Sequence, residues 1–154
     1  MRKVSMQIID FNSKYQHSLM NFIEKVFCEN DIILDIRGKH IDLTQPEMYY
    51  TSFVIVIDKD ANVCGCLGLR VLDEKKKILE IKRLYLLQKY HHLGYGKGMF
   101  DLIINRAQNM QYKYLRLDTE ERFSKAIGLI KSRGFYPIER YNNSAATLFF
   151  EKLL

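Results

Sequence analysis

Apolar residues follow strand-like patterns in seven stretches of the chain, separated by polar turns. Near the start, Val4, Met6 and Ile8 alternate with polar residues, whereas Ser52–Ile57 is almost continuously apolar, as in a strand buried on both faces. Turn-forming residues such as Asp58–Asn62 separate neighbouring stretches. The predicted strands are Val4–Phe11, Ser52–Ile57, Val63–Leu72, Lys77–Leu87, Tyr114–Asp118, Phe135–Glu139 and Ala145–Leu153.

Helical periodicity appears between these strands. Ser13 and Gln16 form a capping-box pattern ahead of apolar residues spaced three and four apart up to Phe27. Gly134 has the position of a left-handed residue that ends a helix. The predicted helices are the one carrying Leu19, Phe22, Ile23, Val26 and Phe27, a short one within 41–50 limited by Pro46, Gly96–Asn109 with Leu102, Ile103, Ala107 and Met110 as its inner stripe, and Phe123–Arg133.

This order of elements predicts an α/β protein with a mixed sheet and helices on both faces. The strand, helix and strand between residues 77 and 118 read as a right-handed parallel crossover, whereas the other neighbouring strands follow tight turns typical of antiparallel pairs. At 154 residues and 47% hydrophobic content, residues 1–154 are expected to form a single domain.

Targeting and membrane signals are not expected. The longest apolar runs are only strand-length, and Met1–Asp10 lacks the apolar core of a signal peptide. Three cysteines, Cys28, Cys64 and Cys66, show no disulfide framework and suit a reducing, cytoplasmic compartment. Cys64 and Cys66 are expected to share one face of a strand; no second Cys/His pair completes four ligands, so no metal site is predicted.

The net charge of +6 leaves the class of partner open. It suits a nucleic-acid-binding domain, and it equally suits a site for a phosphate-rich cofactor. The basic residues are spread along the chain, apart from Lys75–Lys77, and no helix is rich in Arg and Lys. We therefore expect no nucleic-acid partner, and keep that function as an alternative.

The stretch from Leu84 to Phe100 carries the clearest candidate chemistry. An apolar strand runs into a turn with Gly94, Gly96 and Gly98, and the turn opens an amphipathic helix. Glycine allows a positive φ and a close approach of backbone N–H groups to a ligand. A helix N-terminus also carries partial positive charge. The turn is therefore suited to hold a pyrophosphate.

This stretch resembles the acyl-CoA-binding signature of the GCN5-related N-acetyltransferases (GNAT). The loop His91–Gly96, the preceding Glu80–Tyr85, and the later Ser132–Phe135 and Tyr141–Asn143 match that family at the expected separations, over most of residues 50–154. The resemblance implies the GNAT fold, a mixed, mostly antiparallel sheet of six to seven strands flanked by about four helices.

The resemblance also implies that acetyl-CoA is the co-substrate. It would lie in a notch between the strand ending at Leu87 and the parallel strand beginning at Tyr114. Main-chain groups of Leu84, Tyr85 and Leu86 would pair with the pantetheine arm, and the loop would hold the pyrophosphate. The expected loop residues are His91, His92, Leu93, Gly94, Tyr95, Gly96 and Lys97, with His91 standing where the family has Arg or Gln.

Transfer to an amine needs a group that accepts its proton. Glu80 is the candidate base, because it precedes the notch and shares a face with Lys82; a cross-strand ion pair with Arg70 or Lys82 is the alternative for this carboxylate. Arg70 and Lys82 are the candidate acceptor-binding residues, and Arg70 could bind an acceptor carboxylate in bidentate fashion or be a surface arginine.

The group that protonates the leaving thiolate is not the tyrosine that the family usually uses. The family's usual tyrosine corresponds to Ile130, which has no proton to donate. Tyr136 and Tyr85 are predicted in that role, with Tyr141, His91, His92 and water as other sources.

Three functions therefore stay open. The first is an acetyl-CoA-dependent N-acetyltransferase acting on an amine of a small molecule or peptide. The second is a CoA-binding module without turnover, and the third is a nucleic-acid-binding domain. The final strand pair could also supply a homodimer surface.

Overall fold

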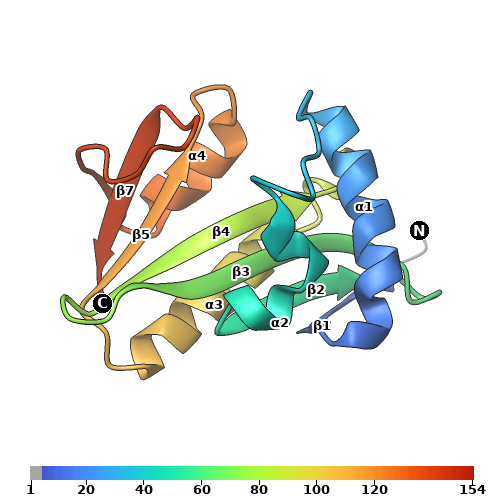
Figure 1. Cartoon of the computed structure of the whole chain (residues 1–154), viewed down its shortest axis with the longest axis horizontal. Helices are drawn as coiled ribbons and strands as arrows, with labels where there is room; N and C mark the ends of the chain where they lie inside the picture. The colour runs from blue at the N-terminus through green and yellow to red at the C-terminus, as the bar shows by residue number, and fades with distance from the viewer. Residues whose placement is uncertain (1–4) are drawn as a thin grey trace.

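The computed structural model describes residues 5–154, which form a seven-stranded mixed sheet (Figure 1). The strand order is β1-β2-β3-β4-β5-β7-β6, and β4 with β5 is a parallel pair among otherwise antiparallel neighbours. The bounds are β1 Gln7–Asp10, β2 Ser52–Ile57, β3 Val63–Asp73, β4 Ile78–Leu86, β5 Tyr114–Thr119, β6 Tyr136–Pro137 and β7 Leu148–Leu153.

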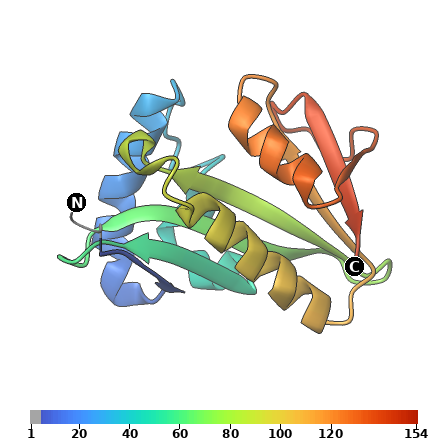
Figure 2. The same ribbon diagram turned by 180° about the vertical axis from the view of Figure 1, so that it is seen from behind.

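Helices cover both faces of the sheet, as predicted. Helix α1 (Gln16–Glu29) and the short α2 (Pro46–Tyr49) lie on the face toward the viewer in Figure 1, whereas α3 (Tyr95–Asn109) and α4 (Ser124–Ser132) lie on the face seen in Figure 2. Short 3-10 helices are Ser13–Tyr15, η2 (Ile41–Thr44) and Gln88–Tyr90. In Figure 1 no helix covers β5 and β7 on the front face, which becomes important for the site.

Two hydrophobic clusters hold these layers together, one on each face. Met99, Phe100 and Ile103 of α3 pack with Leu79 and other residues of the central strands on the rear face. On the front face, residues of α1 such as Phe22 and Phe27 pack with a second set that includes Ile55. Because Val54 and Ile55 contribute to opposite clusters, the apolar run of β2 is buried on both sides, as its sequence predicted.

The predicted strands and helices are present with modest changes at their ends. The strand β2 has the predicted bounds, and β1 is shorter than expected; Val4 lies outside the described residues. The last two strands are also shorter, because the Arg140 guanidinium donates to the carbonyl oxygens of Asn142, Ser144 and Ala146. These bonds extend the loop between the two strands to Ala146, so Ala145 and Ala146 are not in a strand as predicted.

The predicted capping box before α1 is wrong. The Asn12 side chain accepts a hydrogen bond from the Lys14 amide and caps the short 3-10 turn that precedes the helix. Gln16 instead donates from its Nε2 to the Leu43 carbonyl oxygen, 2.9 Å away. Its side chain is therefore used for a long-range contact between α1 and η2.

The prediction that Cys64 and Cys66 share a face is also wrong. Cys64 belongs to the rear hydrophobic cluster and Cys66 to the front one. The pairing of β3 with β2 shifts by one residue at this point, and such a bulge interrupts the alternation of side chains. Both thiols are buried, and their sulfurs donate to the carbonyl oxygens of Asn62 and Arg83, respectively.

Candidate acyl-transfer site

A notch opens in the sheet where β4 and β5 part. The two strands pair only from Ile78 to Glu80 against Tyr114 to Arg116. Beyond Glu80, β4 continues to Leu86 with β3 as its partner and diverges from β5 (Figure 1). The predicted pantetheine-binding residues Leu84, Tyr85 and Leu86 lie in this divergent part, where the β5 side of the backbone is left available for a ligand.

Arg83 interrupts β4 inside the notch. It is a non-glycine residue at φ +63°, beside a register shift between β3 and β4, and this backbone conformation costs about 1–3 kcal/mol. Its guanidinium donates to both oxygens of the Asp42 carboxylate at 2.9 Å and to the Lys39 carbonyl oxygen. No local pattern marks Arg83 in the sequence, since its contact with Asp42 spans 41 positions.

The glycine turn follows β4 and opens helix α3. Gly94 has φ +89° and precedes the helix without a side-chain cap. The Gly98 amide donates to the Gly94 carbonyl oxygen, and the amides of Gly96 and Lys97 precede this first backbone bond of the helix. Helix geometry directs such amides and the positive end of the helix dipole outward. The turn can therefore hold an anionic group.

Gly96 is the glycine of this turn that the protein's own packing does not explain. Gly94 needs its positive φ, and a Cβ at Gly98 would lie 2.9 Å from Ile8 of β1. Within residues 5–154, a Cβ at Gly96 would meet only Leu86 Cδ2, at 3.9 Å. Glycine in a helix costs about 1 kcal/mol relative to alanine, so the open space beside Gly96 fits the close approach of a ligand such as a pyrophosphate.

The two loop histidines have partners within the protein. His91 Nε2 lies 3.0 Å from the Leu86 carbonyl oxygen, which ties the loop to the end of β4. His92 is at φ +68°, and its Nε2 lies 2.9 Å from the Nζ of Lys125 on α4. Lys125 is thus brought beside the predicted phosphate loop, a neighbour that the sequence analysis missed because the contact spans 33 positions.

On the front face, charged side chains line up across the strands beside the notch. Cα pairing aligns Arg70 of β3, Glu80 of β4, Arg116 of β5, Glu151 of β7 and Tyr136 of β6. We call these five residues the charged row. Their sequence neighbours such as Leu79 and Leu115 belong to the rear cluster, so the row faces the opposite side of the sheet.

Glu80, the predicted base, is fully buried within this row. Arg70 Nε and Nη2 lie 2.8 and 2.7 Å from Glu80 Oε1, and the Tyr141 hydroxyl donates to Oε2 at 2.7 Å. Lys82 Nζ is 3.7 Å from Oε2. The ion pair that the sequence offered as the alternative for Glu80 is therefore present. Burial and the Glu80 carboxylate raise the pKa of Tyr141, which keeps its hydroxyl protonated.

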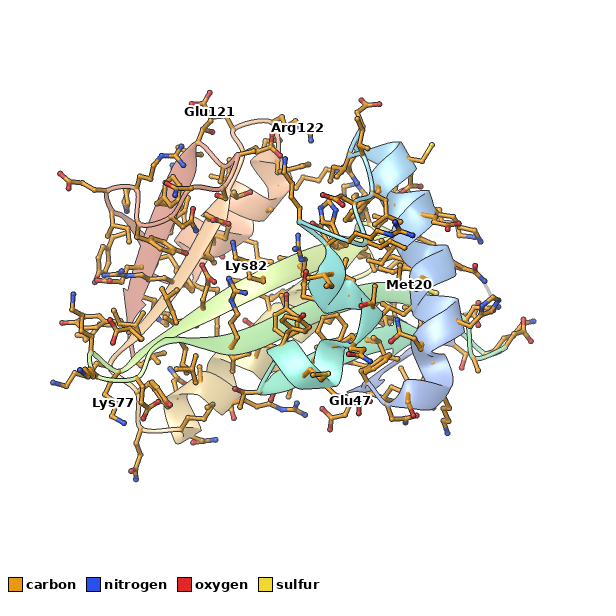
Figure 3. All side chains as sticks on the ribbon, viewed as in Figure 1. Met20, Glu47, Lys77, Lys82, Glu121 and Arg122 are labelled. Atoms are coloured by element: carbon orange, nitrogen blue, oxygen red, sulfur yellow. The ribbon has the colours of Figure 1, made fainter. Side chains whose placement is uncertain are left out.

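Lys82 bridges the two strands where they part. Its Nζ donates to both oxygens of Asp118 on β5, at 3.1 and 3.0 Å, and Figure 3 shows Lys82 near the middle of the front face. Asn142 and Ser144 also donate to the same carboxylate. Burial tends to raise the pKa of Asp118, but Lys82 and these donors outweigh it, so the pKa of Asp118 is lowered.

The tyrosines predicted for thiolate protonation do not contact Glu80. Tyr136 donates to Glu151 at the far end of the row, and this hydrogen bond is the main reason that its pKa is raised to about 12. Tyr85 packs edge-on against Phe27 at 5.2 Å between ring centroids, and burial raises its pKa. The structure brings Tyr141 to Glu80 instead.

Ile130, which stands at the family's usual tyrosine position, is 2% exposed in the rear cluster. Among residues 5–154, no three His, Cys, Asp or Glu side chains gather in a way that could hold a metal ion. Within the same range, none of the helices has the length and apolar character needed to cross a bilayer.

The fold and this arrangement define a class of protein. In this class a mixed sheet separates between the two strands of its parallel pair, and a glycine turn beside the gap begins the helix that connects these two strands. A family model described as "Acetyltransferase (GNAT) family" matches residues 19–135, more than half of the chain. The chain belongs to the GNAT acetyltransferase family.

One curated relative matches part of the chain. An uncharacterised N-acetyltransferase of Dictyostelium discoideum is 35% identical over 79 residues, which are 50% of this chain and 37% of that protein. The matched part is therefore well under two thirds of the relative's length.

Solved structures share the fold over nearly the whole chain. A GNAT-family acetyltransferase from Staphylococcus aureus Mu50 has a TM-score of 0.83 at 24% identity, covering 97% of this chain and 99% of that one. An acetyltransferase from Streptococcus agalactiae 2603 has a TM-score of 0.82 at 23% identity, covering 97% and 98%. PaiA N-acetyltransferase from Thermoplasma acidophilum, solved in complex with coenzyme A, has a TM-score of 0.74 at 16% identity, covering 97% and 99%.

Proposed function

We propose that this protein is an acetyl-CoA-dependent N-acetyltransferase that acetylates an amine by direct attack. The observation that carries the proposal is the open space at Gly96, next to a helix N-terminus and the end of β4 that no longer pairs with β5. Membership of the GNAT family and a structural neighbour with bound coenzyme A support the same co-substrate.

Acetyl-CoA supplies a thioester whose carbonyl carbon is open to nucleophiles. The main chain of Leu84–Leu86 holds its pantetheine arm, and the amides of His92–Lys97 hold the pyrophosphate. Lys125, beside His92, adds a cation at the same loop. These residues bind and orient the co-substrate across the notch.

The acceptor amine approaches from the front face, where the charged row lies. Its nitrogen bonds to the acetyl carbon, the C–S bond breaks, and the electron pair stays on sulfur. The amine loses one proton and the sulfur gains one, so an amide and a thiol are formed. Glu80 receives the amine proton through Oε2, where Tyr141 uses one of the two lone pairs and Lys82, 3.7 Å away, lies beyond hydrogen-bond distance.

The experiment that tests this function measures binding and transfer separately. Calorimetry with acetyl-CoA and release of free thiol with a panel of amines should both give signals. Tight acetyl-CoA binding without thiol release for any amine would leave only the CoA-binding module, which buried Ile130 favours as the second candidate. Gly96→Asp should abolish acetyl-CoA binding by placing a like charge at the phosphate loop while the protein stays folded.

The role of Glu80 as the base is tested by comparing a Glu80 variant with a variant of Tyr141, its hydrogen-bond donor. Glu80→Gln should reduce kcat about 10²-fold and remove the acidic limb of the pH–rate profile, since a base is lost as it becomes protonated. Tyr141→Phe keeps the carboxylate and removes only one donor to it, so the acidic limb should remain. An unchanged limb in Glu80→Gln would show that Glu80 only holds Arg70 and Tyr141 in place.

A further inference from the structure

The ion pairs on the front face present their basic partners outward. In Arg70–Glu80, the side chains are 36% and 0% exposed; in Lys82–Asp118, 16% and 9%; and in Arg116–Glu151, 25% and 11%. The carboxylate is the more buried member each time. Although the charges balance, a molecule approaching this face meets guanidinium and ammonium groups first.

The carboxylates are also more fully engaged than the arginines. Glu80 accepts from Arg70 and Tyr141, and Glu151 accepts from Arg116 and Tyr136. A guanidinium has five N–H groups. Within residues 5–154, the Arg70 guanidinium contacts only Glu80 Oε1, and that of Arg116 donates through Nε to Glu151.

Tyr141 contacts both Glu80 and Arg116, and so links the arginines Arg70 and Arg116 around Glu80. Its hydroxyl holds Glu80, which pairs with Arg70, and the Arg116 guanidinium carbon lies 5.2 Å from the centroid of its ring. In the strand pairing, Glu80 sits directly between Arg70 and Arg116. Two partly exposed guanidinium groups with spare N–H donors therefore lie on either side of Glu80. In the proposed reaction the acceptor nitrogen must lie beside this same residue. Planar donors of this kind match carboxylate and phosphate oxygens.

We infer that the acceptor is an amine that also carries an anionic group, a carboxylate or a phosphate, bound by Arg70 and Arg116. This inference rests on the proposed acetyl transfer and identifies the acceptor's class. The anion stays unchanged in the reaction and fixes the orientation of the amine at the notch. Polyamines and other purely cationic amines are excluded, since they would approach the outward-facing cations of this face.

The first test compares matched amines in the thiol-release assay. The set contains an α-amino acid, its decarboxylated amine, its carboxamide, an aminoalkyl phosphate and a polyamine. Removing or neutralising the anion should lower kcat/KM about 10- to 100-fold, the loss expected for hydrogen bonds to a charged group. Comparing the α-amino acid with the aminoalkyl phosphate shows whether the site prefers a carboxylate or a phosphate. Equal or higher kcat/KM for the decarboxylated amine or the polyamine would overturn the inference.

Variants of the charged row test whether Arg70 and Arg116 bind the anionic group of the acceptor. Arg116→Lys keeps a cation beside Glu151 but loses the planar fork, so KM should rise more for the anionic amine than for the decarboxylated one. Arg70→Lys also disturbs Glu80 and so affects both amines, but KM should again rise more for the anionic one. Arg106→Gln is the control, because Arg106 pairs with Asp10 on another part of the surface and should leave both values unchanged. An equal change for both amines in the row variants would overturn the inference.

A binding measurement separates this inference from the proposed transfer. Should acetyl-CoA bind without any amine being acetylated, the transfer proposal fails, and the product analogues still test the anion site. With CoA present, the N-acetylated amino acid should bind about 10-fold or more tightly than the N-acetylated decarboxylated amine. Equal binding, or no binding of either, would overturn the anion site.

Discussion

The glycines of the turn differ in whether folding requires them. Gly94 supports the turn through its positive φ, and Gly98 allows α3 to pack against Ile8. Gly96 does neither, although it weakens the first turn of the helix. The same logic applies to the carboxylates, because Glu80 and Asp118 are buried only where cations and hydroxyl or amide donors surround them.

Replacing Gly96 with alanine separates stability from binding. Gly96→Ala should raise the free energy of unfolding by about 1 kcal/mol and weaken acetyl-CoA binding about tenfold or more, since the methyl group keeps the phosphate away from an amide. Gly128→Ala in α4 is the matched control, an exposed helical glycine whose Cβ would meet none of residues 5–154 within 4 Å. It should give the stability gain alone. Unchanged affinity in Gly96→Ala would argue against the loop as the phosphate site.

Asp118 should make stability depend on pH in acid. Its pKa in the folded protein is lowered, below the value of about 3.9 in an unfolded chain. Its contribution is therefore complete above about pH 4 and is lost as the pH falls through the folded pKa. Asp118→Asn should flatten the fall in stability below about pH 4 in denaturant titrations. Lys82→Met, which removes the attracting cation, should flatten it as well; an unchanged slope in both variants would contradict this assignment.

At the scale of elements, β4 joins every part of the site. Its first half pairs with β5 and carries Glu80, its middle bends at Arg83, and its last residues border the notch and lead into the glycine turn. The Arg83 side chain fastens the bend to η2 through Asp42, to which Tyr50 also donates. The segment between α1 and β2 thus supports the shape of β4.

Breaking the Asp42–Arg83 pair should weaken the protein far more than breaking a surface pair. Asp42→Asn leaves a largely buried guanidinium without its counter-charge and should cost about 3 kcal/mol in urea unfolding. Asp10→Asn removes the partner of Arg106, and because Asp10 is 69% exposed it should cost less than about 1 kcal/mol. Similar losses in the two variants would mean that the Arg83 contact contributes no more than a surface ion pair.

Element prediction from sequence succeeded where one local pattern dominated. The continuous apolar run of β2 and the 3.6-residue period of α3 need no knowledge of distant partners. It failed where a side chain from elsewhere intervened. Arg140 holds the start of the predicted last strand, Ala145 and Ala146, in a loop, and the Gln16 side chain expected to cap α1 bonds the Leu43 carbonyl oxygen instead.

At the scale of the whole molecule, two parts of the sheet meet at the notch. Three pairs of residues join β4 to β5, and side chains add bridges farther along: Lys82 to Asp118, Lys125 to His92, and Arg122 to the Asn30 carbonyl oxygen. Figure 3 shows Arg122 at the end of the molecule where the β5–α4 loop approaches α1. A co-substrate in the notch would add contacts between the two parts.

Hydrogen exchange should report this organisation. Amides of β2 and of the first half of β3, which are interior strands with buried residues, should exchange most slowly, whereas β7, bordered by the two-residue β6, should exchange faster. Acetyl-CoA should slow exchange at the end of β4 and in β5 more than in β2. Uniform protection of all strands would indicate general stabilisation without a ligand between β4 and β5.

The sequence by itself determined the elements, their order and the position of the glycine turn, because periodicity, turn residues and helix signals act over a few neighbouring residues. It also placed Glu80 beside the notch and offered both the base and the ion pair. Only the tertiary structure decided which partners surround that carboxylate. Tyr141 lies 61 positions from Glu80, and Asp42 lies 41 positions from Arg83. Such contacts depend on how strands stack and where two of them part, and no local pattern records that.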